Sequence, residues 1–378
     1  APSMPQVTLA FELVVNQLAA ELNIDPIEFR LKNAVDEGDV NMMGSTYNAV
    51  GLRECLEVAR KHPHYQATAE EGRGRGVAVG YWINAGMQSS ATLNVTNDGF
   101  LSLITGSPDI GGSRASLGII AAEVLGIPVE RIDPQVGSTD AIGHCDVTGG
   151  SRTTVATGQA VIKAAEQLIL ELRRRAAREW DVESDLVSWE SGAAIYKEQT
   201  MSFLELAKRA GAMGGPLTFS SSLIAKSAAP GFGVHICDAE VDRETGRTTI
   251  VRYTAIQDAG KAVHPTYVEG QMQGGAVQGI GWALNEEYLY DNDGVLENPA
   301  FLDYRIPVAS DLPFIDTVIV EVANPLHPFG IRGVGEVPIV PPMPAVSQAV
   351  FESLGTKVFN LPLNPPKLLA AVKKNIPV

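Results

Sequence analysis

One glutamate of this sequence, Glu336, is flanked by residues that could make its carboxylate a positioned base. Gly333 and Gly335 precede it, and glycine tolerates backbone angles and close contacts that other residues do not. The segment 337–342 follows it, is otherwise apolar, and contains three prolines that stiffen the chain. A carboxylate in apolar surroundings has a raised pKa, which suits it to proton transfer. The pattern favours a general base; the alternative is a tight turn with a solvated glutamate.

Two Gly-Gly-Ser-Arg segments, 111–114 and 149–152, each precede a predicted helix, the first over 115–125 and the second over 155–178. The start of a helix presents unpaired N–H groups and the positive end of the helix dipole. Such a start can bind phosphate, although most Gly-Ser starts only cap a helix. Two of them in one half of the chain indicate a phosphate or pyrophosphate ligand. The candidate binding residues are Gly111, Gly112, Ser113, Arg114, Gly149, Gly150, Ser151, Arg152 and Thr153.

A third candidate segment is the predicted helix 267–284, which contains Gln271, Gln273 and Gln278 together with the pair Gly274-Gly275. A helix of this length normally buries an apolar face, so amides and bare backbone in it need an explanation. Neighbouring backbone groups could satisfy the amides. Alternatively, the amides could hydrogen-bond a large polar cofactor.

The remaining pattern predicts the elements that must position these residues. Asp25-Pro26 has the form of a helix cap followed by the first helical residue, and 97–99 is a turn signal between two alternating segments. The first predicted helix, over 7–22, carries Leu9, Leu13, Leu18 and Leu22 on or near one face. Helices are predicted over 7–22, from residue 26 and over 52–61, and strands over 76–82, 91–95, 100–105, 131–136, 233–241 and 248–257.

These elements predict an α+β fold with two strand-and-helix lobes around a deep cofactor cleft. We expect three regions: an N-terminal helical segment and linker over 1–75, a first lobe over 76–215, and a second lobe with the glutamate loop over 216–378. The size of the chain, 378 residues with 45% hydrophobic and 19% charged residues, is sufficient for a large core.

Charge and hydropathy exclude several classes of function. A formal net charge of −15 argues against a nucleic-acid partner. We find no uninterrupted apolar run of roughly 18 to 20 residues and no basic-then-apolar start, so we expect no membrane span and a cytoplasmic protein.

The cysteines and histidines do not form a metal or redox motif. Cys55, Cys145 and Cys237 are far apart, which is unlike a disulfide framework, an iron–sulfur site or a structural zinc site. The six histidines show no ligand spacing. We therefore expect no metal bound by protein side chains. Any electron-transfer centre must lie outside these cysteines and histidines.

A set of motifs in order along nearly the whole chain resembles the molybdenum hydroxylases, the family of the large subunits of xanthine dehydrogenase, aldehyde oxidase and carbon monoxide dehydrogenase. The resemblance covers the second half of that subunit. The motifs are Asp109-Ile110-Gly111-Gly112, 148–153, Asp258-Ala259-Gly260-Lys261, 269–281, Asn298-Pro299 with Leu302-Asp303-Tyr304, and 333–336 with Pro341-Pro342.

The resemblance implies a function. Glu336 matches the family's catalytic glutamate, a general base in the oxidative hydroxylation of an aldehyde or an N-heteroaromatic compound, with water as the oxygen source. The two Gly-Gly-Ser-Arg segments and Gln271 would hold molybdopterin, which the resemblance implies in its cytosine dinucleotide form, with the molybdenum held by the pterin's own sulfurs. Gly333, Val334 and Gly335, the loop before this base, would also bind the cofactor. Many family members carry Gly-Gln-Gly where this chain has Gly111-Gly112-Ser113.

The resemblance also implies partners. A chain or segment must supply the N-terminal half of the subunit, and separate subunits must carry the iron–sulfur clusters and FAD that remove electrons. We expect an exposed apolar surface near helix 7–22 where that half docks. Two other functions remain open: a non-catalytic scaffold or subunit with the same fold, and a hydrolase pairing Glu336 with a second carboxylate such as Asp303 about 5 to 10 Å away.

Overall fold

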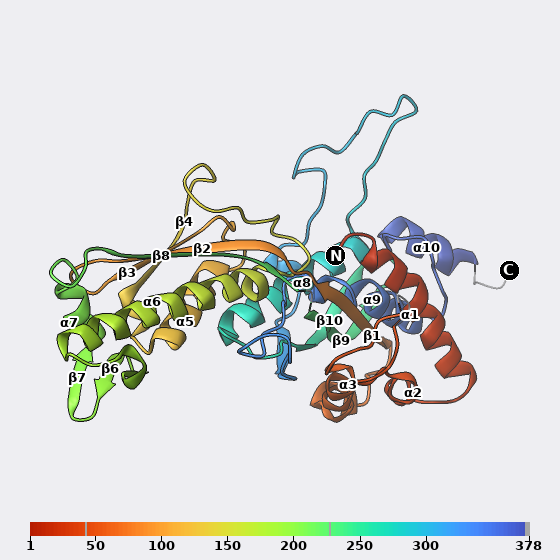
Figure 1. Ribbon diagram of the computed structural model, residues 1–378. Helices are drawn as coiled ribbons and strands as arrows, with labels where there is room; N and C mark the ends of the chain where they lie inside the picture. Colours follow the sequence, from red (N-terminus) through yellow and green to blue (C-terminus); the bar gives the residue numbers. More distant parts are fainter. Residues whose placement is uncertain (42–43, 227, 375–378) are drawn as a thin grey trace. The chain divides into compact units, whose positions relative to one another are not determined.

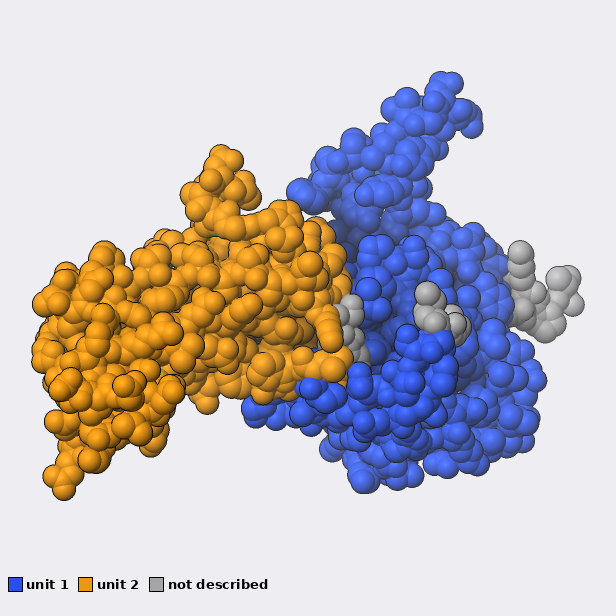
Figure 2. Space-filling view, viewed as in Figure 1, with its two compact units in different colours: residues 1–83, 229–325, 334–378 blue, residues 84–228, 326–333 orange. Residues whose placement is uncertain are grey.

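The structure, a computed structural model, describes residues 1–41, 44–226 and 228–374. The chain forms two compact units (Figure 2). Unit 1 comprises residues 1–83, 229–325 and 334–378, and unit 2 comprises residues 84–228 and 326–333. Because the chain passes from one unit to the other several times, the units are not the continuous regions 1–75, 76–215 and 216–378. The assignment of those regions as functional lobes stays a prediction.

Unit 1 is built on a mixed four-stranded sheet in the order β1-β9-β10-β11 (Figure 1). Strand β10 pairs antiparallel with β9 and parallel with β11. Parallel neighbours require a crossover connection, and helix α8 lies between β10 and β11 in the sequence. The strands are β1 (Arg73–Asn84), β9 (Ala228–Val241), β10 (Thr248–Asp258) and β11 (Ile315–Val320).

Helices cover both faces of this sheet. Val77 and Ile236 pack in a core with α2 and α3, whereas Ala78 and Cys237 pack in a second core with α8 and α9. Successive residues of a strand face opposite sides of a sheet, so the two cores form its two faces. The helices are α1 (Met4–Glu21), α2 (Pro26–Asn33), α3 (Leu52–Lys61), α4 (Pro63–Gln66), α8 (Pro265–Leu284), α9 (Pro342–Leu354) and α10 (Pro365–Lys374), with the 3-10 turns η4 (Ala309–Asp311) and η5 (Val337–Ile339).

The prediction that Leu9, Leu13, Leu18 and Leu22 lie on or near one face of the first helix is wrong. Leu9 and Leu13 pack against the core, but Leu18 and Leu22 are 43% and 58% exposed. The inward face instead carries Glu12 and other polar residues, because α2 presents the buried Arg30, which lies 2.6 Å from the Glu12 carboxylate. An ion pair between two helices therefore determines which face of α1 is buried.

Unit 2 is built on a second four-stranded sheet, in the order β4-β3-β2-β8. The predicted hairpin is confirmed: β2 and β3 pair antiparallel on either side of Asn97-Asp98-Gly99. Helices α5 and α6 pack against this sheet. The elements are β2 (Met87–Val95), β3 (Leu101–Thr105), β4 (Ile132–Val136), β8 (Leu217–Ala225), α5 (Ser113–Leu125) and α6 (Gly158–Glu179), with a peripheral β5 (Ser188–Glu190), β6 (Ala193–Tyr196), β7 (Gln199–Ser202), α7 (Phe203–Lys208), η1 (Val129–Arg131) and η3 (Ser184–Leu186).

The second predicted helix of unit 2 differs from the prediction in its first turn. A π-helical turn, η2 (Thr153–Thr157), precedes α6 where the sequence indicates an α-helix from residue 155. Single π turns of this kind are frequent at functional sites.

Both units mix helices with sheets, as the sequence predicts. Among the residues that the structure describes, no single helix is long and apolar enough to cross a membrane. The pair α1 and α2, bent by 110°, meets the length and composition criteria together.

Candidate functional site

Glu336 lies at the start of the turn η5, where a buried apolar segment follows it. Val337 and Val340 are fully buried, which confirms the expected apolar chain behind the carboxylate. The side chain of Glu336 is 25% exposed, and its Oε1 accepts a hydrogen bond from the amino group of Ala1 at 2.6 Å. The carboxylate is therefore held at a surface that solutes can reach.

Helix α8 packs closely on this turn because it carries glycine where the two meet. A methyl group at Gly275 would lie 2.7 Å from Pro338 Cβ, and one at Gly279 would lie 2.7 Å from Pro342. Such distances are too short for real side chains, so only glycine permits this contact. The close contact brings the amides of α8 to the same side as Glu336.

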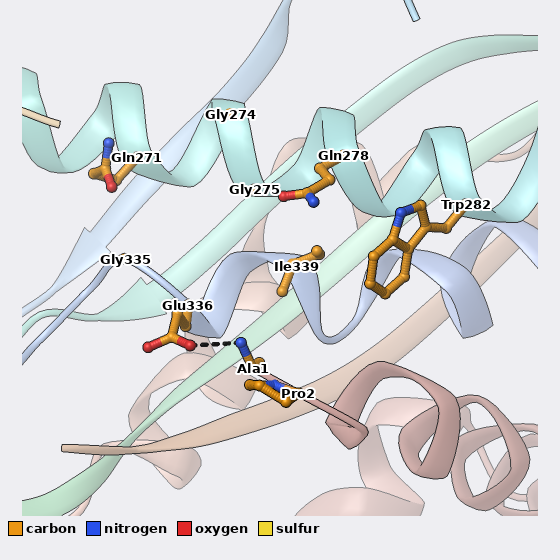
Figure 3. A pocket seen from close by; sticks show the side chains of 10 residues that line it. All are labelled: Ala1, Pro2, Gln271, Gly274, Gly275, Gln278, Trp282, Gly335, Glu336 and Ile339. Atoms are coloured by element: carbon orange, nitrogen blue, oxygen red, sulfur yellow. Dashed lines mark hydrogen bonds and ion pairs between the residues drawn. The ribbon is translucent and has the colours of Figure 1, made fainter. Parts of the chain in front are cut away.

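A pocket of about 440 Å³ lies between α8 and the glutamate turn. Figure 3 shows Gln271 and Glu336 toward one end and Trp282 toward the other, with Gln278 between them on α8. The lining residues are Ala1, Pro2, Gln271, Gly274, Gly275, Gln278, Trp282, Gly335, Glu336 and Ile339. The structure thus brings together Gln271, Gly335 and Glu336 of the predicted site residues.

The glycine loop before Glu336 is held by side-chain amides in each unit. In unit 1, Gln257 Nε2 donates to the carbonyl of Val334 at 3.4 Å. In unit 2, the N–H of Gly333 donates to Asn84 Oδ1 at 3.0 Å, and a methyl group at Gly333 would lie 1.8 Å from the carbonyl oxygen of Ser151. Packing against Ser151 therefore requires glycine at position 333. Val334 takes part through its backbone carbonyl, which accepts the hydrogen bond from Gln257.

The three glutamines of α8 have different roles. Gln273 Nε2 donates to the carbonyl of Ile315 at 3.2 Å, so this amide is satisfied by neighbouring backbone. Gln271 and Gln278 instead line the pocket. The first interpretation is thus confirmed for Gln273, and hydrogen bonding of a cofactor by Gln271 and Gln278 stays a prediction.

In unit 2, the first Gly-Gly-Ser-Arg segment forms the start of α5. Gly111 and Gly112 adopt positive φ angles of 64° and 82°, which explains the need for glycine. Asp109 Oδ1 accepts the backbone N–H of Arg114 at 3.0 Å, and the two side chains form an ion pair at 3.2 Å. Ser113 Oγ donates to the carbonyl of Pro108 at 3.5 Å. The loop therefore has a defined conformation at a helix start.

The second segment is organised by Arg152, which is 1% exposed. Its guanidinium donates to the carbonyls of Gly86 at 2.7 Å, Gln88 at 2.7 Å and Asp146 at 3.0 Å. Burial lowers the pKa of Arg152, although the Asp146 carboxylate counteracts this. The guanidinium thus joins the backbone segments at 86–88 and at Asp146, and these contacts shape the loop around Gly149.

The other residues of this segment differ in what surrounds them. Gly150 and Ser151 have positive φ angles of 75° and 49°. Thr153 Oγ1 donates to Thr148 Oγ1 at 3.5 Å. At Gly149, the nearest atom that a methyl group would meet is Val147 Cγ2 at 3.9 Å, so this position has open space beside it.

Sequence reasoning considered Gln278 with the other glutamines of α8, but it did not select Trp282, which also lines the pocket. Gln278 and Trp282 follow Gln271 by seven and eleven residues, the spacing of one helix face. That spacing is a signal in the sequence for Trp282, because it continues the face begun by Gln271 and Gly274. Asn84, which holds Gly333, has no comparable local signal.

The lining of the pocket fits an organic cofactor better than a metal held by side chains. The amides of Gln271 and Gln278 offer donors and acceptors, and the volume is that of a small-molecule site. Among the described residues, no group of three or more His, Cys, Asp or Glu side chains could hold a metal ion. A metal used here would depend on its cofactor for ligands. Asp303, the second carboxylate of the hydrolase hypothesis, is exposed on the connection between α8 and β11.

Comparison with known proteins shows the family to which this chain is similar. A family described as the molybdopterin cofactor-binding domain matches residues 52–313. The chain is 34% identical to the xanthine dehydrogenase molybdenum-binding subunit of Escherichia coli O157:H7, over 96% of this chain and 52% of that protein. It is 29% identical to the nicotine 6-hydroxylase large subunit of Paenarthrobacter nicotinovorans, over 97% of this chain and 50% of that protein.

A solved structure shows the same fold. The reconstituted CO dehydrogenase from Oligotropha carboxidovorans superposes with a TM-score of 0.89 at 24% identity, over 98% of this chain and 51% of that chain. The chain thus spans about half the length of the relatives it matches. On the family match and the identity to the xanthine dehydrogenase subunit, the chain belongs to the molybdopterin-binding family of xanthine dehydrogenase, aldehyde oxidoreductase and carbon monoxide dehydrogenase.

Proposed function

We propose that this chain is the molybdopterin-binding catalytic portion of a molybdenum hydroxylase that hydroxylates an aldehyde or an N-heteroaromatic compound. The observation that carries the proposal is the pocket in which the Glu336 carboxylate and the Gln271 and Gln278 amides face one space. When bound, the molybdenum cofactor supplies the two-electron oxidant and the site at which water provides the oxygen.

Glu336 is the general base of this proposal. A base must present an accessible carboxylate oxygen at a fixed place. The buried segment after Glu336 and the close contact with α8 restrict its backbone, and its side chain is 25% exposed. In the proposed reaction this oxygen takes a proton from the water-derived nucleophile.

The other residues hold the cofactor. Gln271 and Gln278 hydrogen-bond the pterin, and the helix starts at Gly111 to Arg114 and Gly149 to Thr153 bind its phosphates. Arg152 acts through its own loop, because its guanidinium is directed to backbone carbonyls. The cytosine dinucleotide form of molybdopterin is part of this proposal.

The proposed enzyme needs further polypeptides. The relatives are about twice the length that this chain matches. We propose that the unmatched half of the large subunit completes the site, and that iron–sulfur and flavin subunits remove the electrons.

Replacing Glu336 by Gln tests the role of the base. The substitution keeps the size of the side chain but removes the base, so turnover of the assembled enzyme should fall by about two to four orders of magnitude. Molybdenum content, measured by metal analysis, should stay near that of the wild type. Glu54→Gln, at an exposed position on α3, is the matched control and should keep full turnover.

Near-normal turnover of Glu336→Gln would remove Glu336 as the base. A wild-type enzyme that assembles without molybdenum would instead favour the non-catalytic homologue, which the replacement of the family's usual glutamine by Gly112 also favours.

A further inference from the structure

The connection 285–314, between α8 and β11, is a long irregular segment of unit 1. It leaves α8 and projects as an extended loop, drawn in light blue in Figure 1 and seen as a projection of unit 1 in Figure 2. Its regular structure is one isolated bridge between Tyr290 and Leu296 and the short turn η4. Loops of this length without structure of their own are uncommon, and many are functional.

The segment carries large apolar side chains that are almost fully exposed. Phe301 is 87% exposed, Leu302 is 91% exposed and Phe314 is 82% exposed, and Tyr288 and Tyr290 are also exposed. Single exposed apolar residues are ordinary, but a group of them on one projecting segment is typical of an interaction site.

Specific contacts shape the base of this segment. The buried Asn298 donates to the carbonyl of Glu287 at 2.7 Å and accepts the N–H of Leu289 at 2.9 Å. The Tyr304 hydroxyl donates to Glu286 Oε2 at 2.7 Å. The exposed apolar residues are therefore presented by an anchored loop, which we call the arm (residues 285–314).

The charge of the arm restricts what it can bind. It contains seven acidic residues and a single arginine, Arg305, and the whole chain has a formal charge of −15. A second copy of this chain would bring more negative charge to an acidic arm, which disfavours that pairing. A suitable surface would present apolar pockets with basic groups around them.

We propose that the arm docks on the half of the large subunit that this chain does not match. This inference rests on the proposed function, which includes that half as a partner. The relatives have about as much chain outside the match as inside it. The arm also begins beside the pocket, because Trp282 lines the pocket one helical turn before Glu286, the partner of Tyr304. Docking of the arm would thus connect the unmatched half with one wall of the pocket.

A photo-cross-linking amino acid placed at Phe301 of the assembled enzyme identifies the occupant. After irradiation, peptide mapping should find the cross-link in the unmatched half of the large subunit. A cross-link to a second copy of this chain or to another subunit, or none at all, would overturn the proposal. The control is the same amino acid at Ile224, an 80% exposed position on β8, which should give no cross-link to that half.

Trypsin gives a second readout, because Arg305 is the single basic residue of the arm. In the assembled wild-type enzyme, cleavage after Arg305 should be at least about ten-fold slower than in Phe301→Ser/Leu302→Ser, whose docking is weakened. Ile224→Ser should behave as the wild type. Equal cleavage in the wild type and the double variant would contradict the proposal. Neither readout needs turnover, so Glu336→Gln assembled enzyme should cross-link normally even if the catalytic proposal fails.

Discussion

Gly149 and Gly150 are neighbours in the sequence, but a methyl group would meet different surroundings at the two positions. At Gly149 the nearest atom is Val147 Cγ2 at 3.9 Å. At Gly150 the backbone has a φ of 75°, and a methyl group would lie 2.8 Å from Ala85 Cβ. Alanine at Gly150 should therefore destabilise the fold, because the space for its side chain is taken by its own unit.

The variant that tests cofactor binding at this loop is Gly149→Ala alone. Its stability should stay within about 0.5 kcal/mol of the wild type, since the position is open. If the backbone holds a phosphate there, the added methyl group should reduce the molybdenum content of the assembled enzyme. Gly150→Ala should instead lower the unfolding free energy by roughly 1–2 kcal/mol.

The control for the alanine variants is Gly211→Ala, at a position where no described atom lies within 4 Å of the added methyl group. Molybdenum content equal in Gly149→Ala and Gly211→Ala would indicate a plain helix start at Gly149.

A buried histidine should make the stability of the chain depend on pH. His235 of β9 is fully buried, with Nδ1 2.9 Å from the Tyr253 hydroxyl, and burial lowers its pKa to about 3. Between about pH 3 and pH 6.5 the unfolded chain binds a proton at this residue and the folded chain does not. The contribution of His235 to the unfolding free energy is therefore fully present above the unfolded pKa. It is lost as the pH falls, by roughly 1.4 kcal/mol per pH unit.

Urea unfolding at pH 6 and pH 4.5 measures this dependence. His235→Gln should flatten the slope, whereas His144→Gln, at an exposed histidine, should leave it unchanged. An unchanged slope in His235→Gln would contradict the assignment.

At the scale of elements, the ion pair between α1 and α2 decides which face of α1 is buried. Glu12 and Arg30 are 4% and 5% exposed, and Glu12 Oε2 also accepts the N–H of Val79 of β1 at 2.7 Å. Removing one partner would leave the other charge buried without compensation. Glu12→Gln should therefore lower the unfolding free energy by about 3–5 kcal/mol, measured by urea unfolding.

Two comparison variants distinguish burial of charge from loss of contact. Glu12→Met/Arg30→Met removes both charges and should recover most of the lost stability. Asp36→Asn breaks the exposed pair with Arg53, whose side chains are 54% and 42% exposed, and should cost less than about 1 kcal/mol. A loss in Glu12→Gln as small as that in Asp36→Asn would refute a structural role for the buried pair.

At the scale of the whole molecule, the outward face of α1 presents an apolar stripe. Val7, Phe11 and Val14 are 60%, 65% and 57% exposed. A groove of about 230 Å³ beside them is lined by residues of α1 and α9 and by Lys357 and Phe359. The expected apolar surface near this helix is thus present, and its coverage by the unmatched half of the subunit remains a prediction.

This surface predicts how the chain behaves by itself. The chain alone should self-associate and bind little molybdenum cofactor, because exposed apolar stripes associate in water. Phe11→Ser/Val14→Ser should shift the chain toward the monomer in light scattering, whereas Leu186→Ser, an exposed leucine of unit 2, should not. A wild-type chain that is monomeric and carries a full complement of molybdenum would contradict the prediction.

Local sequence determined the parts of this protein that depend on nearby residues. Asp25 caps α2 as predicted, accepting the N–H groups of Ile27 and Glu28, because a helix cap joins residues two or three positions apart. The apolar, proline-rich segment after Glu336 and the hairpin at Asn97-Asp98-Gly99 follow from the same kind of short-range pattern.

Only the tertiary structure decided the contacts between distant parts of the chain. Leu18 and Leu22 are exposed because the ion pair with Arg30 holds Glu12 on the buried face of α1. The Arg152 guanidinium donates to backbone carbonyls more than sixty residues away in sequence and to one nearby. Trp282 faces the Glu336 pocket because glycines let α8 approach η5 and α9. Burial, ion pairing and close packing between elements determine these arrangements, and a single segment of sequence contains only one side of each contact.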